Sequence, residues 1–236
     1  FGFGIALPPI LKVGSDYLKQ KVAREIITGQ KIMALAVTEP YAGSDVAQLE
    51  TTAKRVRDDK TGEEFFIVNG EKKFITCGCK AHYFTVAVRT HPDTSRGMNG
   101  VSLLLLERGM PGLETRRMKT QGWWISNTAF VTMTNVKVPV KNLIGKENNG
   151  FRPIMNNFNH ERFVFAAMST RFARDCLEDA VKFARIRKTF GKRLIDHQVI
   201  RHKMAEMARK IESTHALLEQ TAYQMDLYEE GNKNSR

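Results

Sequence analysis

The stretch ALAVTEPYAGSDV, residues 34–46, joins a run of apolar residues to a polar loop. The apolar part predicts a buried strand. The polar part predicts a tight loop, because Gly43 gives the backbone freedom while Ser44 and Asp45 supply short polar side chains. Such a loop can present N–H and hydroxyl groups to a phosphate or a cofactor ring. A plain turn after a strand has the same composition.

Helical patterns lie on both sides of this stretch. Before it, Ser15 can cap a helix whose apolar residues recur every four positions, and Gly29 fits the end of that helix. After it, the sequence predicts two long helices, over about residues 151–186 and 197–230, with a break centred on Gly191. Two such helices cannot bury an apolar stripe against each other alone. We therefore expect further helices or another subunit to cover them.

Residues 32–139 read as short β-rich runs separated by turn residues. Asn69-Gly70 predicts a hairpin between two of these runs. The runs are IMALAV (32–37), EEFFIVNG (63–70), KFIT (73–76), YFTVAV (83–88), VSLLLLE (101–107) and TAFVTMTNVKVP (128–139). They predict an α+β fold in which an antiparallel β-barrel or sandwich is flanked by α-helical domains. The expected domains are the end of an N-terminal helical domain, a middle β-domain and the start of a helical bundle, at 1–30, 31–140 and 141–236.

The composition, 42% apolar and 26% charged over 236 residues, is that of a globular protein. The chain begins at Phe1 rather than Met, so we expect it to be part of a longer polypeptide. No apolar run approaches the roughly 18 residues of a membrane span. Cys77, Cys79 and Cys176 form neither a disulfide framework nor a metal-binding pattern. We therefore expect an intracellular protein without a metal.

The net charge is +12, and the excess is uneven, since residues 111–236 carry 22 basic and 13 acidic side chains. A basic surface can bind nucleic acid, an acidic membrane surface or a polyphosphate ligand. It can also be the solvated face of amphipathic helices. No nucleic-acid motif accompanies the charge, and aromatic residues are not interleaved with the basic ones, so nucleic-acid binding is not expected.

The stretch NNFNHERFVFAAM, residues 156–168, places Glu161 next to Arg162 ahead of an apolar run. On a helix, this pair can be an ordinary solvent-facing salt bridge. The carboxylate can also point into a pocket and act as a catalytic base.

Four segments occur in the order and at the approximate spacing found in acyl-CoA dehydrogenases. They are ALAVTEPYAGSDV (34–46), VNGEKKFITCG (68–78), VKVPVKNLIG (136–145) and RIRKTFGKRLIDHQ (185–198). The chain resembles this flavoenzyme family essentially from end to end. The family's earlier N-terminal helices and later C-terminal helices have no counterpart in it.

The resemblance implies an FAD site on the middle β-domain. Leu35, Val37 and Thr38 would contact the flavin, and Ser44 would lie near its pyrophosphate and the substrate. The family's second motif usually reads Trp-Ile-Thr, whereas this chain has Phe74-Ile75-Thr76. Phe74 would lie against the isoalloxazine ring without the indole N–H, and Thr76 would hydrogen-bond the reactive N5 edge.

The resemblance also implies contact with the FAD of a neighbouring subunit. Arg187 offers a planar fork for phosphate oxygens, Phe190 an aromatic surface, and Gln198 an amide for adenine or ribose. A homodimer or homotetramer is therefore expected. Taken alone, Arg187 can equally be a solvated cation at a helix end.

Most family members carry the catalytic Glu on a late loop that this chain does not include. A subset, similar to the isovaleryl- and long-chain-type enzymes, carries it on the first long helix directly before an Arg. NHERFVFA matches the second arrangement. The implied roles are Glu161 as base, with Arg162 and Asn159 binding the substrate.

The expected reaction is the FAD-dependent α,β-dehydrogenation of an acyl-CoA to a trans-2-enoyl-CoA, as in β-oxidation of fatty acids. Electrons would pass to an electron-transfer flavoprotein, in the mitochondrial matrix, the cytoplasm or a peroxisome. One alternative is an oxidase on the same fold that passes electrons to oxygen, acting on an acyl-CoA or a nitroalkane. Another is a DNA-associated or assembly relative that uses the basic surface.

Overall fold

The computed structural model describes residues 2–234. Contacts divide the chain into two compact units, the first ending at Phe158 and the second beginning at Asn159. In the part of the chain that the structure describes, no helix is both long enough and apolar enough to span a membrane.

The first unit opens with short helical segments. They are a π-helical turn (Gly2–Ala6), α1 (Pro8–Val13), α2 (Asp16–Leu18), a second π-helical turn (Lys19–Ala23) and α3 (Arg24–Ile27). The Leu18 amide donates to Ser15 Oγ at 3.3 Å, which confirms the predicted cap. Gly29 has a φ of 72°, the left-handed conformation in which chains commonly leave a helix.

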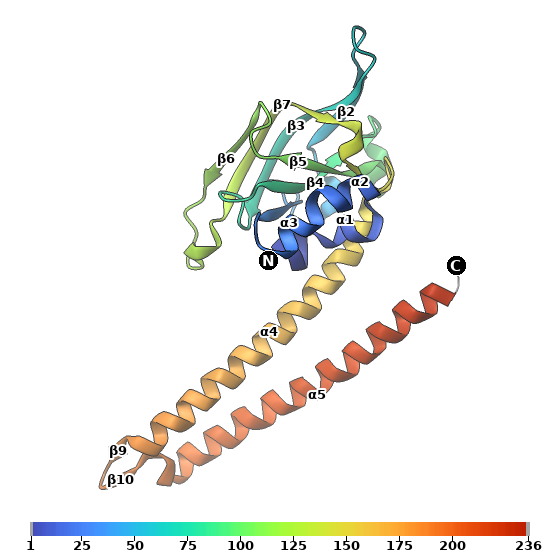
Figure 1. Cartoon of the computed structure of the whole chain (residues 1–236). Helices are drawn as coiled ribbons and strands as arrows, with labels where there is room; N and C mark the ends of the chain where they lie inside the picture. The colour runs from blue at the N-terminus through green and yellow to red at the C-terminus, as the bar shows by residue number, and fades with distance from the viewer. Residues whose placement is uncertain (1, 235–236) are drawn as a thin grey trace. The chain divides into compact units, whose positions relative to one another are not determined.

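Eight strands form the sheet of this unit (Figure 1). They are β1 (Met33–Ala36), β2 (Thr52–Arg57), β3 (Glu64–Ile75), β4 (Tyr83–Arg89), β5 (Val101–Glu107), β6 (Leu113–Arg117), β7 (Ala129–Pro139) and β8 (Leu143–Ile144). All six predicted runs lie in strands, so the α+β class is confirmed. β2, β6 and β8 were not predicted.

The sheet is mixed rather than purely antiparallel. Its order is β6-β7-β3-β2-β4-β5-β8, and β1 pairs with β4 off this path. β1 and β2 both run parallel to β4, while the other pairs of this sheet are antiparallel. Within residues 2–234 the end strands β6 and β8 do not pair with each other, so the sheet does not close into a barrel.

The predicted hairpin at Asn69-Gly70 was wrong. Both residues lie inside the single strand β3, whose register against β7 shifts between Val68 and Gly70. Gly70 has a φ of 144°, and a Cβ there would lie 2.6 Å from Thr51 Oγ1. The glycine therefore serves a β-bulge and a close approach to Thr51 instead of a turn.

Two apolar cores occupy the two faces of the sheet. One packs the N-terminal helices and the first turns of α4 (Phe151–Ile186) against residues such as Leu103 and Leu105. The other contains Phe66, Phe84 and Leu104, and it takes residues from β3, β4, β5 and β7. Because side chains alternate along a strand, β4 and β5 contribute to both cores.

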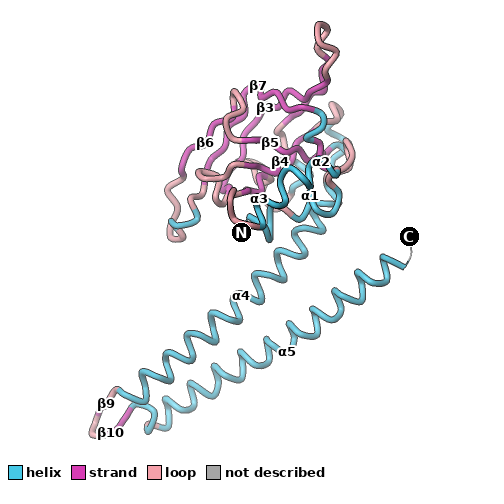
Figure 2. The backbone as a smooth tube through the Cα atoms, in the orientation of Figure 1, coloured by secondary structure: helices cyan, strands magenta, loops and turns pink. Residues whose placement is uncertain are grey.

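The second unit consists of the rest of α4, a small hairpin and α5 (Gln198–Asn234) (Figure 2). The predicted first helix, residues 151–186, is confirmed at both ends. The hairpin pairs β9 (Lys188–Thr189) with β10 (Lys192–Arg193). Phe190 and Gly191 form its turn with φ values of 51° and 78°, the two positive values that a type I′ turn requires.

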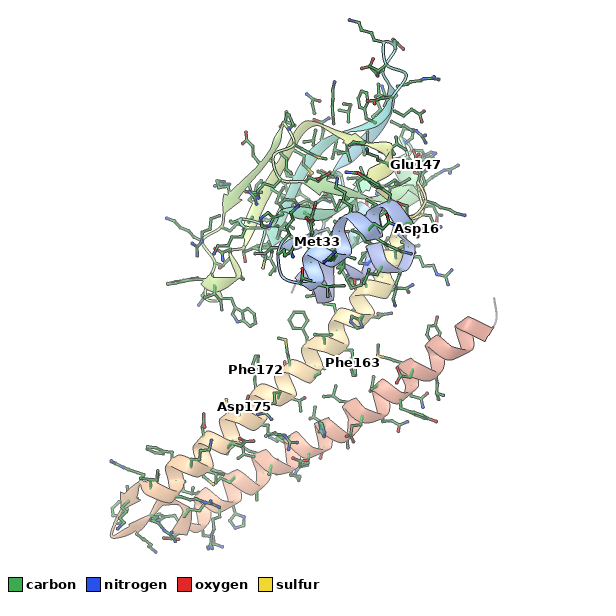
Figure 3. The ribbon with its side chains drawn as sticks, viewed as in Figure 1. Asp16, Met33, Glu147, Phe163, Phe172 and Asp175 are labelled. Carbon is green, nitrogen blue, oxygen red and sulfur yellow. The ribbon has the colours of Figure 1, made fainter. Side chains whose placement is uncertain are left out.

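The two helices of this unit bury little against each other. Among its described residues, only Thr170, Ala184 and Ile211 are buried. Phe163 lines a groove of about 480 Å³ between α4 and α5, whereas Phe172, nine positions further along α4, is 54% exposed (Figure 3). The exposed apolar surface agrees with the expectation that other helices or another subunit cover this pair.

Candidate functional site

The polar loop after β1 begins next to the buried sheet. Leu35 pairs with Thr85 of β4, and Val37 is buried in the core below the N-terminal helices. The Glu39 amide donates to the Ala42 carbonyl at 2.9 Å, which closes the loop into a tight turn. Ser44 is exposed on this loop. The sequence therefore yields a short polar loop held by its own backbone and by β1.

Phe74 has an unusual backbone and an exposed ring. Its φ is 60°, its side chain is 55% exposed, and the register of β3 against β7 shifts between Lys72 and Ile75. A residue other than glycine in this conformation costs on the order of 1–3 kcal/mol, and such strain clusters at functional sites. The ammonium of Lys73 lies 5.0 Å from the ring centroid. The bulge therefore presents an aromatic face to solvent instead of burying it.

A backbone hydrogen bond joins the two motifs. The Lys73 amide donates to the Thr38 carbonyl at 2.8 Å, so the end of β1 lies beside the segment that carries Phe74. Thr76 follows on the same segment and is half-buried. The next residue, Cys77, also has a positive φ, 61°, and its amide donates to the Ser126 carbonyl at 2.7 Å. Segments about 35 residues apart in the sequence thus form one surface.

Beneath this surface lies a buried ion pair that the sequence analysis missed. The Lys72 side chain is fully buried, and its Nζ donates to Glu39 Oε1 at 2.7 Å and to the Val37 carbonyl at 3.1 Å. Burial lowers the pKa of Lys72 to about 8, although the Glu39 charge opposes the fall. Burial alone would raise the pKa of Glu39, but the Lys72 charge and hydrogen bonds from Lys72, Thr51 and Glu50 hold it below its ordinary value. Both side chains are therefore charged near pH 7.

The predicted phosphate clamp lies at the hairpin end of the second unit. Arg187 is exposed, and its backbone is fixed by hydrogen bonds to Phe183 and from Leu194. The ring of Phe190 is 95% exposed and makes an edge contact with His197, at 6.5 Å between centroids. Gln198 is exposed at the start of α5, with its amide nitrogen 3.5 Å from His202 Nε2. The structure brings these three predicted residues to one small region.

The predicted acid–base group lies on α4. Glu161 is half-buried. Burial raises its pKa, and the charge of Arg162 opposes only part of that rise. Arg162 Nη1 donates to Asn159 Oδ1 at 2.8 Å, so two of the three predicted substrate-binding side chains bind each other. Glu161 forms no ion pair shorter than 4 Å within the described residues, and a carboxylate of this kind can act as a base.

No group of three or more His, Cys, Asp or Glu side chains is arranged to hold a metal within residues 2–234. In the first unit, the candidate site residues form a strained aromatic and a polar loop, which suit a flat organic ligand. In the second unit, they are a partly desolvated carboxylate on α4 and, apart from it, an exposed arginine beside the hairpin.

Comparisons with known proteins identify the family to which the chain is similar. The family model of the acyl-CoA dehydrogenase middle domain matches residues 34–136, and that of the C-terminal domain matches residues 148–233. An acyl-CoA dehydrogenase of Emericella nidulans is 43% identical over 225 residues, which is 95% of this chain and 50% of the relative. The cyclohexane-1-carbonyl-CoA dehydrogenase of Geobacter metallireducens is 37% identical over 229 residues, 97% of this chain and 57% of the relative.

A solved structure is similar to the chain as well. Butyryl-CoA dehydrogenase from Megasphaera elsdenii matches with a TM-score of 0.86 at 31% identity, over 95% of this chain and 58% of that chain. The chain belongs to the acyl-CoA dehydrogenase family. It spans only about half the length of the relatives that it matches.

Proposed function

We propose that this chain carries the flavin-binding and proton-abstracting parts of an FAD-dependent acyl-CoA dehydrogenase. The observation that carries the proposal is a single surface with two parts. One part is the polar loop after β1, residues 37–45, called the Thr38 loop below, and the other is the strained, exposed Phe74. An exposed aromatic ring held at an energetic cost needs a use, and stacking on a flat ring is one that its geometry supports.

FAD fits the residues that the structure places there. Phe74 would lie against the isoalloxazine ring, with Thr76 near its N5 edge and the backbone of Leu35, Val37 and Thr38 beside it. Ser44 is exposed and free to face a pyrophosphate or the substrate. When bound, FAD supplies the hydride acceptor of the reaction. The protein's task at this surface is to bind and orient the ring.

Glu161 is proposed as the catalytic base. Thioester α-protons are weakly acidic, so the base must be partly desolvated to remove one, and the raised pKa of Glu161 fits this need. The α-proton would pass to the carboxylate of Glu161 as the β-carbon loses hydride, which leaves a trans-2-enoyl-CoA. Arg162 and Asn159 would release each other and bind the acyl-CoA.

Arg187, Phe190 and Gln198 are proposed to bind the FAD of a second subunit. Arg187 directly follows the last residue of α4, 26 positions after Glu161. A helix rises about 1.5 Å per residue, so roughly 40 Å separates them. That distance exceeds the length of an extended dinucleotide, which argues against both acting on one cofactor in one copy. A homodimer, or a homotetramer built from such dimers, would bring them to separate sites.

Acyl-CoA thioesters are the proposed substrate class, with an electron-transfer flavoprotein as acceptor. Dehydrogenation of fatty acyl-CoA in β-oxidation is one setting for this chemistry. The relatives above are named for acyl-CoA, cyclohexane-1-carbonyl-CoA and butyryl-CoA, so the family accepts several acyl groups. No observation favours an oxidase or a nucleic-acid-binding role.

Anaerobic titration of the full-length polypeptide tests the proposal. The purified protein should be yellow with bound FAD, and an acyl-CoA should bleach its visible absorption. A protein that stays colourless after FAD is added would overturn the flavoenzyme assignment. A yellow protein that no acyl-CoA reduces would overturn the substrate class.

A further inference from the structure

The buried pair of Glu39 and Lys72 lies where three segments of the first unit meet. Glu39 belongs to the loop after β1, and Lys72 lies on β3 two residues before Phe74. The third segment leads into β2. Its Glu50 and Thr51 amides donate to the Glu39 carboxylate at 2.6 and 3.0 Å. The Glu39 carboxylate, on the loop after β1, thus accepts hydrogen bonds from two other segments, the one that leads into β2 and β3 itself.

The two faces of this junction are tightly constrained. Lys72 lies between the two register shifts of β3, one after Val68 and one before Ile75. On one side, Gly70 approaches Thr51 so closely that any side chain would clash with its backbone, and Thr51 Oγ1 donates to the Glu71 carbonyl at 3.3 Å. On the other side lies the strained backbone of Phe74. The ion pair therefore lies at the end of a short regular stretch, residues 70–72, that separates two irregular parts of β3.

Stability alone does not account for this arrangement. The attraction between two buried ions offsets their loss of hydration only when the geometry is very good. Apolar residues of similar size often stabilise a core at least as well. A buried ion pair also restrains geometry, because a buried charged group tolerates few positions of its partner. Here this restraint fixes the position of the loop after β1 relative to the segment that carries Phe74 and Thr76.

We propose that Glu39 and Lys72 are positioning residues that set the distance between the Thr38 loop and the Phe74 bulge, and so the shape that receives the isoalloxazine ring. Neither side chain is placed to touch the ring, since Lys72 is fully buried and the Glu39 side chain nearly so. They act through the chain neighbours of Glu39 and Lys72, since Thr38 directly precedes Glu39 and its carbonyl accepts from the amide of Lys73, the residue between Lys72 and Phe74. This inference rests on the proposed function, because it assigns the surface to a flavin.

The test compares three variants of the full-length polypeptide by FAD affinity and by the visible circular dichroism of the bound flavin. Lys72→Met removes the charge and keeps most of the volume. Glu39→Asp keeps the charge and withdraws the carboxylate by one methylene. Glu25→Gln is the matched control, because it breaks a partly exposed ion pair with Lys31, 2.9 Å long, elsewhere in the same unit.

Lys72→Met and Glu39→Asp should raise the FAD dissociation constant by about tenfold or more, as expected when a preorganised site is loosened. At saturating FAD, both should change the visible dichroism, which reports the placement of the ring and which a mere loss of stability leaves unchanged. Glu25→Gln should match the wild type in both measurements. If Lys72→Met does not fold, Glu39→Asp alone tests the positioning role by the same two measurements, since it leaves no unpaired buried charge.

Folded variants with the wild-type dissociation constant and the wild-type dichroism would overturn the positioning role and leave the proposed function intact. A wild-type protein that binds no FAD would overturn the proposed function, and this inference with it. The two failures are therefore distinguishable from the wild-type sample alone.

Discussion

The two units of the chain bury their side chains very differently. The first has an apolar core on each face of its sheet, and the strands β4 and β5 are buried along nearly their whole length. The second has three buried residues in its described part, and large apolar side chains such as Phe183, Ile186 and Leu217 are more than half exposed. The first unit holds its site residues against a buried core, whereas the second carries its own on a largely exposed surface.

The site residues differ in the same way. In the first unit, backbone hydrogen bonds and a buried ion pair fix the Thr38 loop and the Phe74 bulge. In the second, Arg187, Phe190 and Gln198 are exposed and depend on one small hairpin. We infer a division of labour: the first unit orients the flavin ring, and the second supplies a base and a phosphate contact that assembly completes.

The largest expected effect comes from Glu161→Gln in the second unit. A general base contributes roughly 10²–10⁴-fold, so flavin reduction by acyl-CoA should slow by that order while FAD content stays normal. Because burial raises the pKa of Glu161 above 4.5, the wild-type rate should fall as the pH falls through that raised pKa. The rate of the variant should not show this fall at low pH. Stopped-flow reduction measures both.

Glu178→Gln is the matched control for this change, since Glu178 is an exposed acid on the same helix. It should leave the reduction rate and its pH profile unchanged. A Glu161→Gln rate within about tenfold of the wild type would assign Glu161 to the helix surface and the base to another segment.

The second prediction concerns the pH dependence of the first unit. Lys72 loses its proton at about pH 8 when folded, against an ordinary value of 10.5. Between these values the unfolded chain binds more protons, so this group raises the free energy of unfolding as the pH rises. Its contribution is complete above pH 10.5 and is lost as the pH falls through about 8.

Lys72→Met has no such group. The stability of the wild type minus that of Lys72→Met should therefore rise between pH 8 and pH 10 by on the order of 2 kcal/mol. Urea unfolding of the two proteins at both pH values measures the change. A difference that does not depend on pH would contradict the buried position of Lys72.

A third prediction tests the dependence of the second unit on assembly. Arg187→Ala should weaken FAD retention and oligomerisation together, by about tenfold in FAD affinity, because a bidentate phosphate contact is lost. Arg187→Lys should rescue only part of this effect, since lysine lacks the planar fork. Size-exclusion chromatography and flavin content decide. Arg201→Ala, at an exposed arginine near the start of α5, is the control.

The smallest effect is expected for the stability of Phe74→Gly. Glycine relieves the positive φ, which offsets the lost contacts of a half-exposed ring, so the unfolding free energy should change by less than about 1 kcal/mol. FAD should nevertheless bind more weakly. Phe65→Gly, on the same strand without a positive φ, should lower stability clearly. Equal losses in both variants would contradict the strain at Phe74.

The sequence was sufficient where local pattern and burial agree. The long helix of residues 151–186 and all six apolar strand runs were predicted, because their periodicity reflects what they bury. β2 was missed since its sequence, TAKRVR, is largely charged, and it forms only because β3 and β4 lie on either side. Asn69-Gly70 has the composition of a turn, but its glycine meets a close contact with Thr51 that lies far away in the sequence.

The same limit explains the missed ion pair. In EKKF, residues 71–74, Lys72 looks like an ordinary surface lysine. Only the carboxylate of Glu39, 33 positions earlier, makes its burial possible. Glu161 and Arg187 were predicted as site residues only from the motifs in which they lie, because no local pattern distinguishes a catalytic acid or a phosphate-binding arginine from a solvated one.

The most direct test of the division of labour is exchange of the substrate's α-proton with solvent deuterium, followed by mass spectrometry under anaerobic conditions. Wild type and Glu161→Gln would be compared at equal FAD content. We expect α-deuteration of the acyl-CoA by the wild type and its near absence with the variant, although both hold flavin. Equal exchange by the two proteins would contradict the assignment of the base to Glu161.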